Sequence, residues 1–305
     1  MCSALDYTIV TMNKLPTESR SQILTLLCEG MSMRAITRAT GVSINTVTKL
    51  LVDAGEACAE FHDEAVRNVK AQRVQCDEIW SFTYAKANHV LGAKAAPDRA
   101  GDVWTWTALD ADSKLIISWL VGPRVKDAAH SFMYDLSNRL GNSPVQITTD
   151  GLRAYVDAVW ENFGESVDFG QLVKLYGPAP EGQHRYSPPQ CIGAVKHPVF
   201  GNPDPKHIST SFVERQNLTM RMQMRRFTRL TNGFSKKFEN HCHALAIYFV
   251  WYNWIRIHKS LRVTPAMAAG LTDKLVDWSD VVHMIDNREL GAKISRAEKP
   301  AQISP

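Results

Sequence analysis

The chain has 305 residues, of which 45% are hydrophobic and 22% are charged, a composition that is ordinary for a soluble globular protein. No apolar stretch is long enough to span a bilayer, and no basic segment followed by an apolar run marks the N-terminus for secretion. The sequence therefore indicates a cytoplasmic protein without a membrane partner. Its six cysteines form no C-x-x-C pair, which argues against a disulfide scaffold and a structural zinc site.

Residues 1–56 are predicted to form a helical DNA-binding domain. Three helices are expected to begin near Thr17, Ser32 and Ser43, because each of these hydroxyl residues can cap a helix. Gly41 lies between the second and third helices, where a residue without Cβ accepts a positive φ. Two helices joined by such a turn are typical of a helix-turn-helix domain, although a generic three-helix bundle has the same caps.

The third of these helices is expected to present polar side chains to DNA. Val47 and Leu50 repeat at helical spacing and would face inward. Four polar residues would then face outward: Ser43, Asn45, Thr48 and Lys49. Short polar side chains at the start of a helix are suited to reading base edges in a major groove, so these four are candidate DNA-binding residues.

After a polar helical connector over residues 57–72, the hydrophobic period changes to that of strands. The predicted order is three strands (73–82, 103–110 and 114–121), a helix (126–140), a strand (145–149), a helix ending near 163 and a strand (171–176). This is the order of the α/β ribonuclease H-like fold, in which helices cover a sheet. The core is predicted to span residues 73–270, followed by a C-terminal helix and tail over residues 271–305.

Residues 177–210 are rich in proline and glycine and are interpreted as a long loop or a small insertion within the core. A basic helix is predicted to follow. Residues 211–237 contain seven arginines and lysines and a single acid, Glu214. A localised basic strip of this kind is suited to a phosphate backbone, and a solvated helix face is the alternative interpretation.

Three carboxylates stand at positions that indicate a metal site. Asp77 lies within the first predicted strand, Asp150 ends a later strand, and Glu214 lies in the first turn of the basic helix. A carboxylate inside an apolar strand is costly to bury unless it meets a cation. Converging carboxylates can hold two Mg²⁺ ions for phosphodiester displacement. Glu78 and Asp110 compete with Asp77 for this role.

Three other groups of residues give weaker indications. His241, Cys242 and His243 are metal-ligating residue types, but neighbours on a helix point in different directions, so packing is the favoured interpretation. Trp104 and Trp106 share one strand face and are interpreted as core rather than as a base-stacking surface. A loop metal site in the insertion is a weaker hypothesis, and its candidates are His184, Cys191, His197 and His207.

The sequence resembles the Asp-Asp-Glu (DDE) transposases of prokaryotic insertion sequences, and among them the insertion sequence one family. The resemblance lies in CDEIWSF at residues 76–82, TDG at 149–151 and SFVERQN at 211–217, and in Arg221, seven positions after the glutamate. The YN…R…HKSL…TPA run over residues 252–266 is similar to the end of integrase-type cores. Two features depart from the family: a cysteine-rich zinc motif is absent, and the second and third acids are 64 positions apart.

The resemblance implies a metal-dependent transposase. Asp77, Asp150 and Glu214 would be the catalytic residues and would hold two Mg²⁺ or Mn²⁺ ions, with no zinc expected. Arg221 would contact DNA phosphate or steady the glutamate, and the N-terminal helices would bind the ends of the element. Arg225 is a further candidate DNA-binding residue, because eleven positions after Glu214 it lies close to the same helix face. The partners implied are double-stranded DNA and further copies of the chain assembled on it, within the nucleoid of a prokaryote. The alternatives are a ribonuclease H-like nuclease without strand joining and a transposon-derived DNA-binding repressor.

Overall fold

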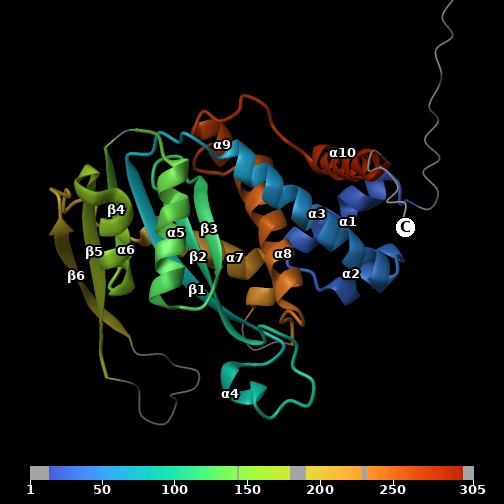
Figure 1. Ribbon diagram of the computed structural model, residues 1–305, viewed down its shortest axis with the longest axis horizontal. Coiled ribbons are helices and arrows are strands. Elements are labelled where there is room, and N and C mark those ends of the chain that lie inside the picture. The colour runs from blue at the N-terminus through green and yellow to red at the C-terminus, as the bar shows by residue number, and fades with distance from the viewer. Residues whose placement is uncertain (1–13, 143, 179–189, 229–231, 298–305) are drawn as a thin grey trace, which may run out of the picture.

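The computed structural model describes residues 14–142, 144–178, 190–228 and 232–297. Its centre is a six-stranded sheet with the strand order β3-β2-β1-β4-β5-β6 (Figure 1). The strands are β1 Arg73–Thr83, β2 Gly101–Asp110, β3 Ile116–Gly122, β4 Val145–Asp150, β5 Val167–Tyr176 and β6 Cys191–Phe200. Strands β1, β4 and β5 are mutually parallel, whereas β2 and β6 run antiparallel to their neighbours. The α/β, ribonuclease H-like fold class predicted from the sequence is confirmed.

Helices cover both faces of this sheet (Figure 1). They include α5 Lys126–Arg139, α6 Ala154–Phe163, α7 Ser211–Gln223 and α8 Phe238–Val250, and α8 continues into one π-helical turn, Trp251–Ile255. On one face Trp106 of β2 packs against Phe132 of α5 and Tyr155 of α6. On the other face α7 lies against β1. Because successive side chains of a strand point to opposite faces, neighbouring residues of β1 meet different helices.

The N-terminal segment forms α1 Thr17–Cys28, α2 Met33–Thr40 and α3 Ile44–Ala65. The caps predicted at Ser32 and Ser43 are confirmed, since their side chains accept hydrogen bonds from backbone N–H groups three residues further on. Gly41 has the predicted left-handed conformation, with φ 72°. The prediction of a cap at Thr17 is wrong. Thr17 is already helical, because the extended residue Pro16 takes the cap position before it.

Helix α3 is 22 residues long and runs through residues 56 and 57 without a break. It crosses α8 at close range. A Cβ atom added at Gly55 would lie 2.3 Å from the Cβ of His243, so only glycine permits this approach. One hydrophobic core joins Ile23 of α1 to the sheet and to Ile285 near the C-terminus. The N-terminal helices are thereby packed onto the α/β part of the molecule.

Of the two interpretations of residues 177–210, an uninterrupted long loop is wrong, because residues 191–200 form strand β6, whereas a small insertion is compatible with this strand. This strand pairs only with β5 and lies at the edge of the sheet. Its Pro198 has no N–H to donate, and an edge strand tolerates this because one side of its ladder is unused. The proline that argued against a strand is therefore compatible with this one position in the sheet.

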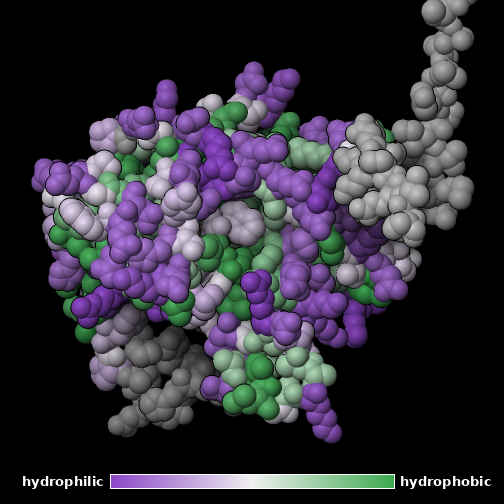
Figure 2. Space-filling model, in the orientation of Figure 1, coloured by the Kyte–Doolittle hydropathy of each residue, from purple (hydrophilic) through white to green (hydrophobic). Residues whose placement is uncertain are grey.

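The remaining elements are short helices in connections and the C-terminal helix. They are α4 Ala87–Val90, η1 Gly164–Ser166, η2 Arg225–Phe227, α9 Pro265–Ala268 and α10 Trp278–Ala297. Helix α4 belongs to a long β1–β2 connection that carries a group of hydrophobic side chains on the face seen in Figure 2. Helix α10 returns to α1 and α3, where Arg288 pairs with Glu56 at 2.5 Å and Glu60 at 2.8 Å. In the part of the chain that the structure describes, no helix is both long and apolar enough to cross a membrane.

Candidate active site

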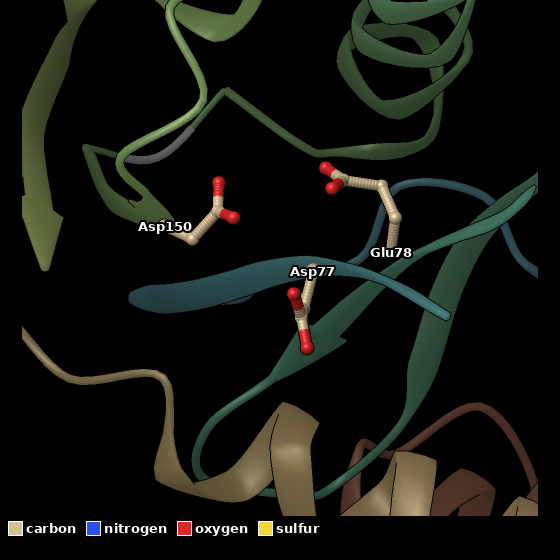
Figure 3. Close-up of side chains that lie close together, drawn as sticks. All are labelled: Asp77, Glu78 and Asp150. Atoms are coloured by element: carbon tan, nitrogen blue, oxygen red, sulfur yellow. The ribbon is translucent and has the colours of Figure 1, made fainter. Parts of the chain in front are cut away.

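The pairing of the central strands β1 and β4 brings two carboxylates side by side, near the carboxyl end of β4. Gln75 pairs with Thr148 in the parallel ladder, and two residues further along each strand stand Asp77 and Asp150. Oxygens of Asp77, Glu78 and Asp150 lie within 4.8 Å of one another (Figure 3). No other group of three or more acids, histidines and cysteines this close occurs among the described residues.

The side chain of Gln75 anchors the start of α7 on β1. Its Oε1 accepts hydrogen bonds from the backbone N–H groups of Phe212 at 2.8 Å and Val213 at 3.2 Å. These N–H groups belong to the first turn of a helix, where they have no partner within the helix itself. One turn later, Asn217 donates from Nδ2 to Oδ2 of Asp77 at 2.8 Å. Both contacts hold the turn that carries Glu214 beside the two aspartates.

An open cavity of about 500 Å³ lies between β1, β4, β5 and α7. All three acids singled out from the sequence line it: Asp77, Asp150 and Glu214. Three basic side chains line it as well: Arg124, Arg153 and Lys174. An acidic centre with a basic rim is suited to an anionic substrate that binds together with cations.

Burial and charge change the acidity of this centre. Burial, helped by the nearby carboxylates of Asp150 and Glu214, raises the pKa of Asp77 to about 7, against the hydrogen bond from Asn217. Burial and the charge of Asp150 likewise raise the pKa of Glu78 to about 7. The charged forms of Asp77 and Glu78 are thus disfavoured, and a cation bound beside them would favour them. The donors are all oxygens, the ligand type that hard divalent cations such as Mg²⁺ and Mn²⁺ require, so the residues fit such an ion.

Glu78 and Asp110 were the alternative candidates to Asp77. Glu78 lies near the site, whereas Asp110 does not. Glu78 points to the opposite side of β1 from Asp77 (Figure 3) and has a side chain only 1% exposed. Arg124 joins it to Asp150 through nitrogen–oxygen distances of 3.1 Å to each carboxylate. Asp110 instead accepts hydrogen bonds from the backbone of Asp112 and Ser113 and fixes the β2–β3 turn.

Glu214 reaches the cavity but is paired differently from the two aspartates. Its Oε2 lies 2.6 Å from Nζ of Lys174, and its Oε1 accepts a hydrogen bond from the hydroxyl of Thr210. Its oxygens are not among those within 4.8 Å of one another. Sequence reasoning missed Lys174 and Arg124, which arrive through strand pairing. Asn217 could have been predicted from the sequence. It follows Glu214 by three residues, and residues three apart are neighbours on a helix surface.

The basic helix that was predicted to carry both Arg221 and Arg225 is shorter than expected. Helix α7 ends at Gln223, because Met224 is extended (φ −118°, ψ 113°), and Arg225 lies in the short turn that follows. Arg221 stays on α7, half-buried and two turns beyond Glu214. Arg226 is half-buried and donates to Oγ of Ser235 at 2.7 Å. The basic residues of this segment therefore do not share one helical face.

The four residues predicted to face DNA lie at the start of α3, far along the chain from the acids. Ser43, Asn45 and Lys49 are exposed. Thr48 is half-buried, and its hydroxyl donates to the carbonyl of Ile44 at 2.7 Å. Lys49 pairs with Asp53 on the same helix and lies 3.8 Å from Glu289 of α10.

The packing interpretation of the histidines on α8 is confirmed. His241 is fully buried between the hydroxyls of Ser81 and Ser235, and burial together with Arg226 lowers its pKa to about 3. His243 lies instead against Gly55.

The other weak candidates also lie apart from any metal cluster. Cys191, His197 and His207 form no such cluster within the described residues, and His184 lies outside them. Trp106 is a fully buried core residue, as expected, whereas Trp104 is partly buried beside Arg124.

Comparison with known proteins gives likeness at the level of structure only. No protein-family model matches the sequence, and no curated protein matches it. The piggyBac transposase, in a synaptic complex with hairpin DNA, is similar with a TM-score of 0.39 and 11% identity, over 95% of this chain and 74% of that one. The Mos1 strand transfer complex has a TM-score of 0.22 and 14% identity, and the Mos1 transposase paired-end complex 0.20 and 13%. Each Mos1 match covers 52% of this chain and 59% of the Mos1 chain.

Proposed function

We propose that this protein is a transposase that binds the ends of a mobile DNA element, cuts a strand there and joins it to target DNA. The observation that carries the proposal is the convergence of Asp77, Asp150 and Glu214, from β1, β4 and α7, on one open cavity with a basic rim. The motifs around these acids support the finer assignment to prokaryotic insertion sequences, with work at the nucleoid in the cytoplasm.

In this proposal the three carboxylates hold two Mg²⁺ or Mn²⁺ ions, which when bound stabilise charge on the attacking and leaving oxygens of a phosphodiester. The chain's own side chains do the rest. Asn217 keeps the carboxylate of Asp77 oriented through its 2.8 Å hydrogen bond. Arg124 and Lys174, each 34% exposed, can exchange a carboxylate partner for a DNA phosphate. Positioning and charge neutralisation supply the catalysis, and no covalent enzyme intermediate is involved.

The test is incubation of the purified protein with Mg²⁺ and labelled duplexes taken from the inverted repeats expected beside the gene. Joined products support a transposase. Nicks without joining would mean a nuclease that uses the same cavity, and a gel shift without cleavage would mean a DNA-binding repressor. Either of the last two results contradicts the proposal.

The proposal assigns recognition of the element ends to residues 1–56, within a homo-oligomer assembled on DNA. Asn45→Ala is expected to lower the preference for an element end over random DNA by roughly tenfold, since a base-edge contact contributes about 1–3 kcal/mol of discrimination. Lys49→Ala is expected to weaken binding to both DNAs alike, because a lysine at phosphate adds affinity without sequence preference. Parallel titrations with the two duplexes measure this. Equal loss on both duplexes for Asn45→Ala would exclude it as a reader.

Arg221 is assigned a phosphate near the reacting one, because it lies two turns beyond Glu214 on α7. Arg221→Ala is expected to lower strand joining by about tenfold or more, the order of one lost charge-assisted hydrogen bond at roughly 1.5–3 kcal/mol. Arg221→Lys should fall in between, since lysine keeps the charge without the planar fork. Lys236→Ala is the matched control, an exposed residue of the same basic segment. A joining assay at fixed salt measures all three, and equal loss in the control would reduce Arg221 to general electrostatics.

A further inference from the structure

A second cavity, of about 460 Å³, lies on another face of α7 and takes no part in the site described above. We call it the Arg256 pocket. It is lined by the β2–β3 turn, by α7 and by the segment after α8, through residues that include Lys114, Phe212, Arg215, Tyr252, Arg256 and Lys259. Four of these six side chains are cationic, and no residue that lines the pocket is acidic.

Within the described chain, the cations of this pocket have little anionic compensation. Lys114 is influenced by the charges of Asp110 and Asp112 in the β2–β3 turn. Its ammonium donates to the carbonyl of Ala111. None of its four cationic side chains lies within ion-pairing distance of a carboxylate among the described residues, whereas arginines elsewhere, such as Arg139 and Arg288, bind two carboxylates each. Nη1 of Arg256 is buried without a hydrogen-bond partner there. A buried guanidinium nitrogen without an acceptor is costly, so an anion that supplied an acceptor would stabilise Arg256.

The pocket is built before any ligand enters. Asn253 fixes the segment after α8 to β3, with its side-chain amide both accepting from the N–H and donating to the carbonyl of Ile116 at 2.9 Å. Three residues later, Arg256 lies over the ring of Trp251 at 5.0 Å. The ammonium of Lys114 lies 3.2 Å from the ring centre of Phe212. Burial and the charges of Arg256 and Lys114 lower the pKa of His258 to about 4, which keeps that lining residue neutral.

Helix α7 separates the pocket from the candidate active site. Glu214 lines the catalytic cavity, while its neighbour Arg215 and Thr219, one turn further on, line the Arg256 pocket. A helix with its side chains is about 10–12 Å across. A duplex advances about 3.4 Å per base pair, so a duplex that runs across α7 would cover this width in roughly three to four base-pair steps.

We propose that the Arg256 pocket binds one phosphodiester group of the same DNA whose reacting phosphate lies in the catalytic cavity. Arg256 and Arg215 would hold its oxygens through planar forks, and Lys114 and Lys259 would add charge. This inference rests on the proposed action on DNA. In this proposal the segment after α8 supplies a second phosphate contact, and that contact determines which phosphate of the DNA strand lies at the acids.

The experiment is phosphate-ethylation interference with the full chain in EDTA, so that DNA is bound but not cut. The probe is a labelled duplex from the DNA that flanks the gene. Arg215→Ala, Lys259→Ala and the charge-conserving Arg256→Lys are compared with Lys70→Ala, an exposed lysine before β1. Each pocket variant is expected to lose interference at the same one or two phosphates. Arg215→Ala should bind about tenfold more weakly and reduce the salt slope of binding by about one.

An interference pattern that is unchanged in the pocket variants, or lost equally in Lys70→Ala, would overturn the pocket. Thermal melts of each variant exclude unfolding as the cause, and Arg215 and Lys259 are tested separately so that one unstable variant does not decide the result. Failure of the two proposals can be told apart. If the wild type joins DNA and the pocket variants keep every phosphate contact, only the proposal for the Arg256 pocket is contradicted. If the wild type neither nicks nor joins DNA but the pocket variants lose one phosphate contact, only the proposal of a transposase is contradicted.

Discussion

In a Mg²⁺-dependent assay of cleavage and joining, Asp77→Asn, Asp150→Asn and Glu214→Gln are each expected to lower activity by at least about 100-fold. Loss of a group that merely supports a metal ligand costs roughly 10–100-fold, and loss of a ligand should exceed it. A neutral amide is a far poorer ligand than a carboxylate for a hard cation. DNA binding, measured by titration without metal, should change by no more than a few-fold. Substantial activity in any one variant would remove that residue from the site.

Two further variants give this result its meaning. Glu78→Gln is expected to lower activity less than Asp77→Asn, because Glu78 points to the other side of β1 and acts on Asp150 through Arg124. Asp157→Asn, an exposed acid on α6, should leave activity unchanged. An effect of Glu78→Gln as large as that of Asp77→Asn would identify Glu78 as a ligand itself. The acidic centre would then be Asp77, Glu78 and Asp150, without the need for Glu214.

The sheet could be predicted from the sequence where the chain repeats with a clear period. Strands β1 and β4 were expected to within about one residue, because apolar side chains alternate at the start of each: Val74 and Cys76 in β1, and Val145 and Ile147 in β4. Strand β6 could not be predicted. Its Pro198 is tolerated only because the strand lies at the edge of the sheet, and that place is a property of the whole fold. The end of α7 was missed for a similar reason, since no glycine or proline marks it.

The residues of the candidate site also differ in whether the sequence alone could predict them. The three acids stand in short local motifs, and a motif can be read without knowing what packs against it. Lys174 and Arg124 belong to no local sequence motif. They lie beside Glu214 and Asp150 only because of the order in which the strands pair, so the sequence alone did not indicate them. The Arg256 pocket is lined by three separate segments of the chain, and only the folded molecule shows that its lining has four cations and, among the described residues, no acid.

The raised pKa of Asp77 leads to the last expected result: without metal, Asp77→Asn should make the protein more stable while it removes activity. A carboxyl whose pKa rises on folding, here from 3.8 to about 7, binds its proton more tightly in the folded state. Above pH 7 the buried charge therefore opposes folding, by about 4 kcal/mol at most. As pH falls from 7 toward 4 the folded state takes up the proton, and this penalty disappears.

Melts of wild type and Asp77→Asn in EDTA, at steps from pH 8 to pH 5.5, measure the effect. The variant should be more stable by about 1–3 kcal/mol at pH 8, with a gap that narrows as pH falls and Asp77 of the wild type becomes neutral. The buried histidines titrate alike in both proteins and cancel in the difference. Asp157→Asn, which removes an exposed charge, should have no such trend. Mg²⁺ should stabilise the wild type at pH 8 far more than the variant, since it binds the charged carboxylates. A variant that is less stable than wild type at pH 8 would mean that Asp77 is a structural acid, held by Asn217 rather than kept charged for a metal.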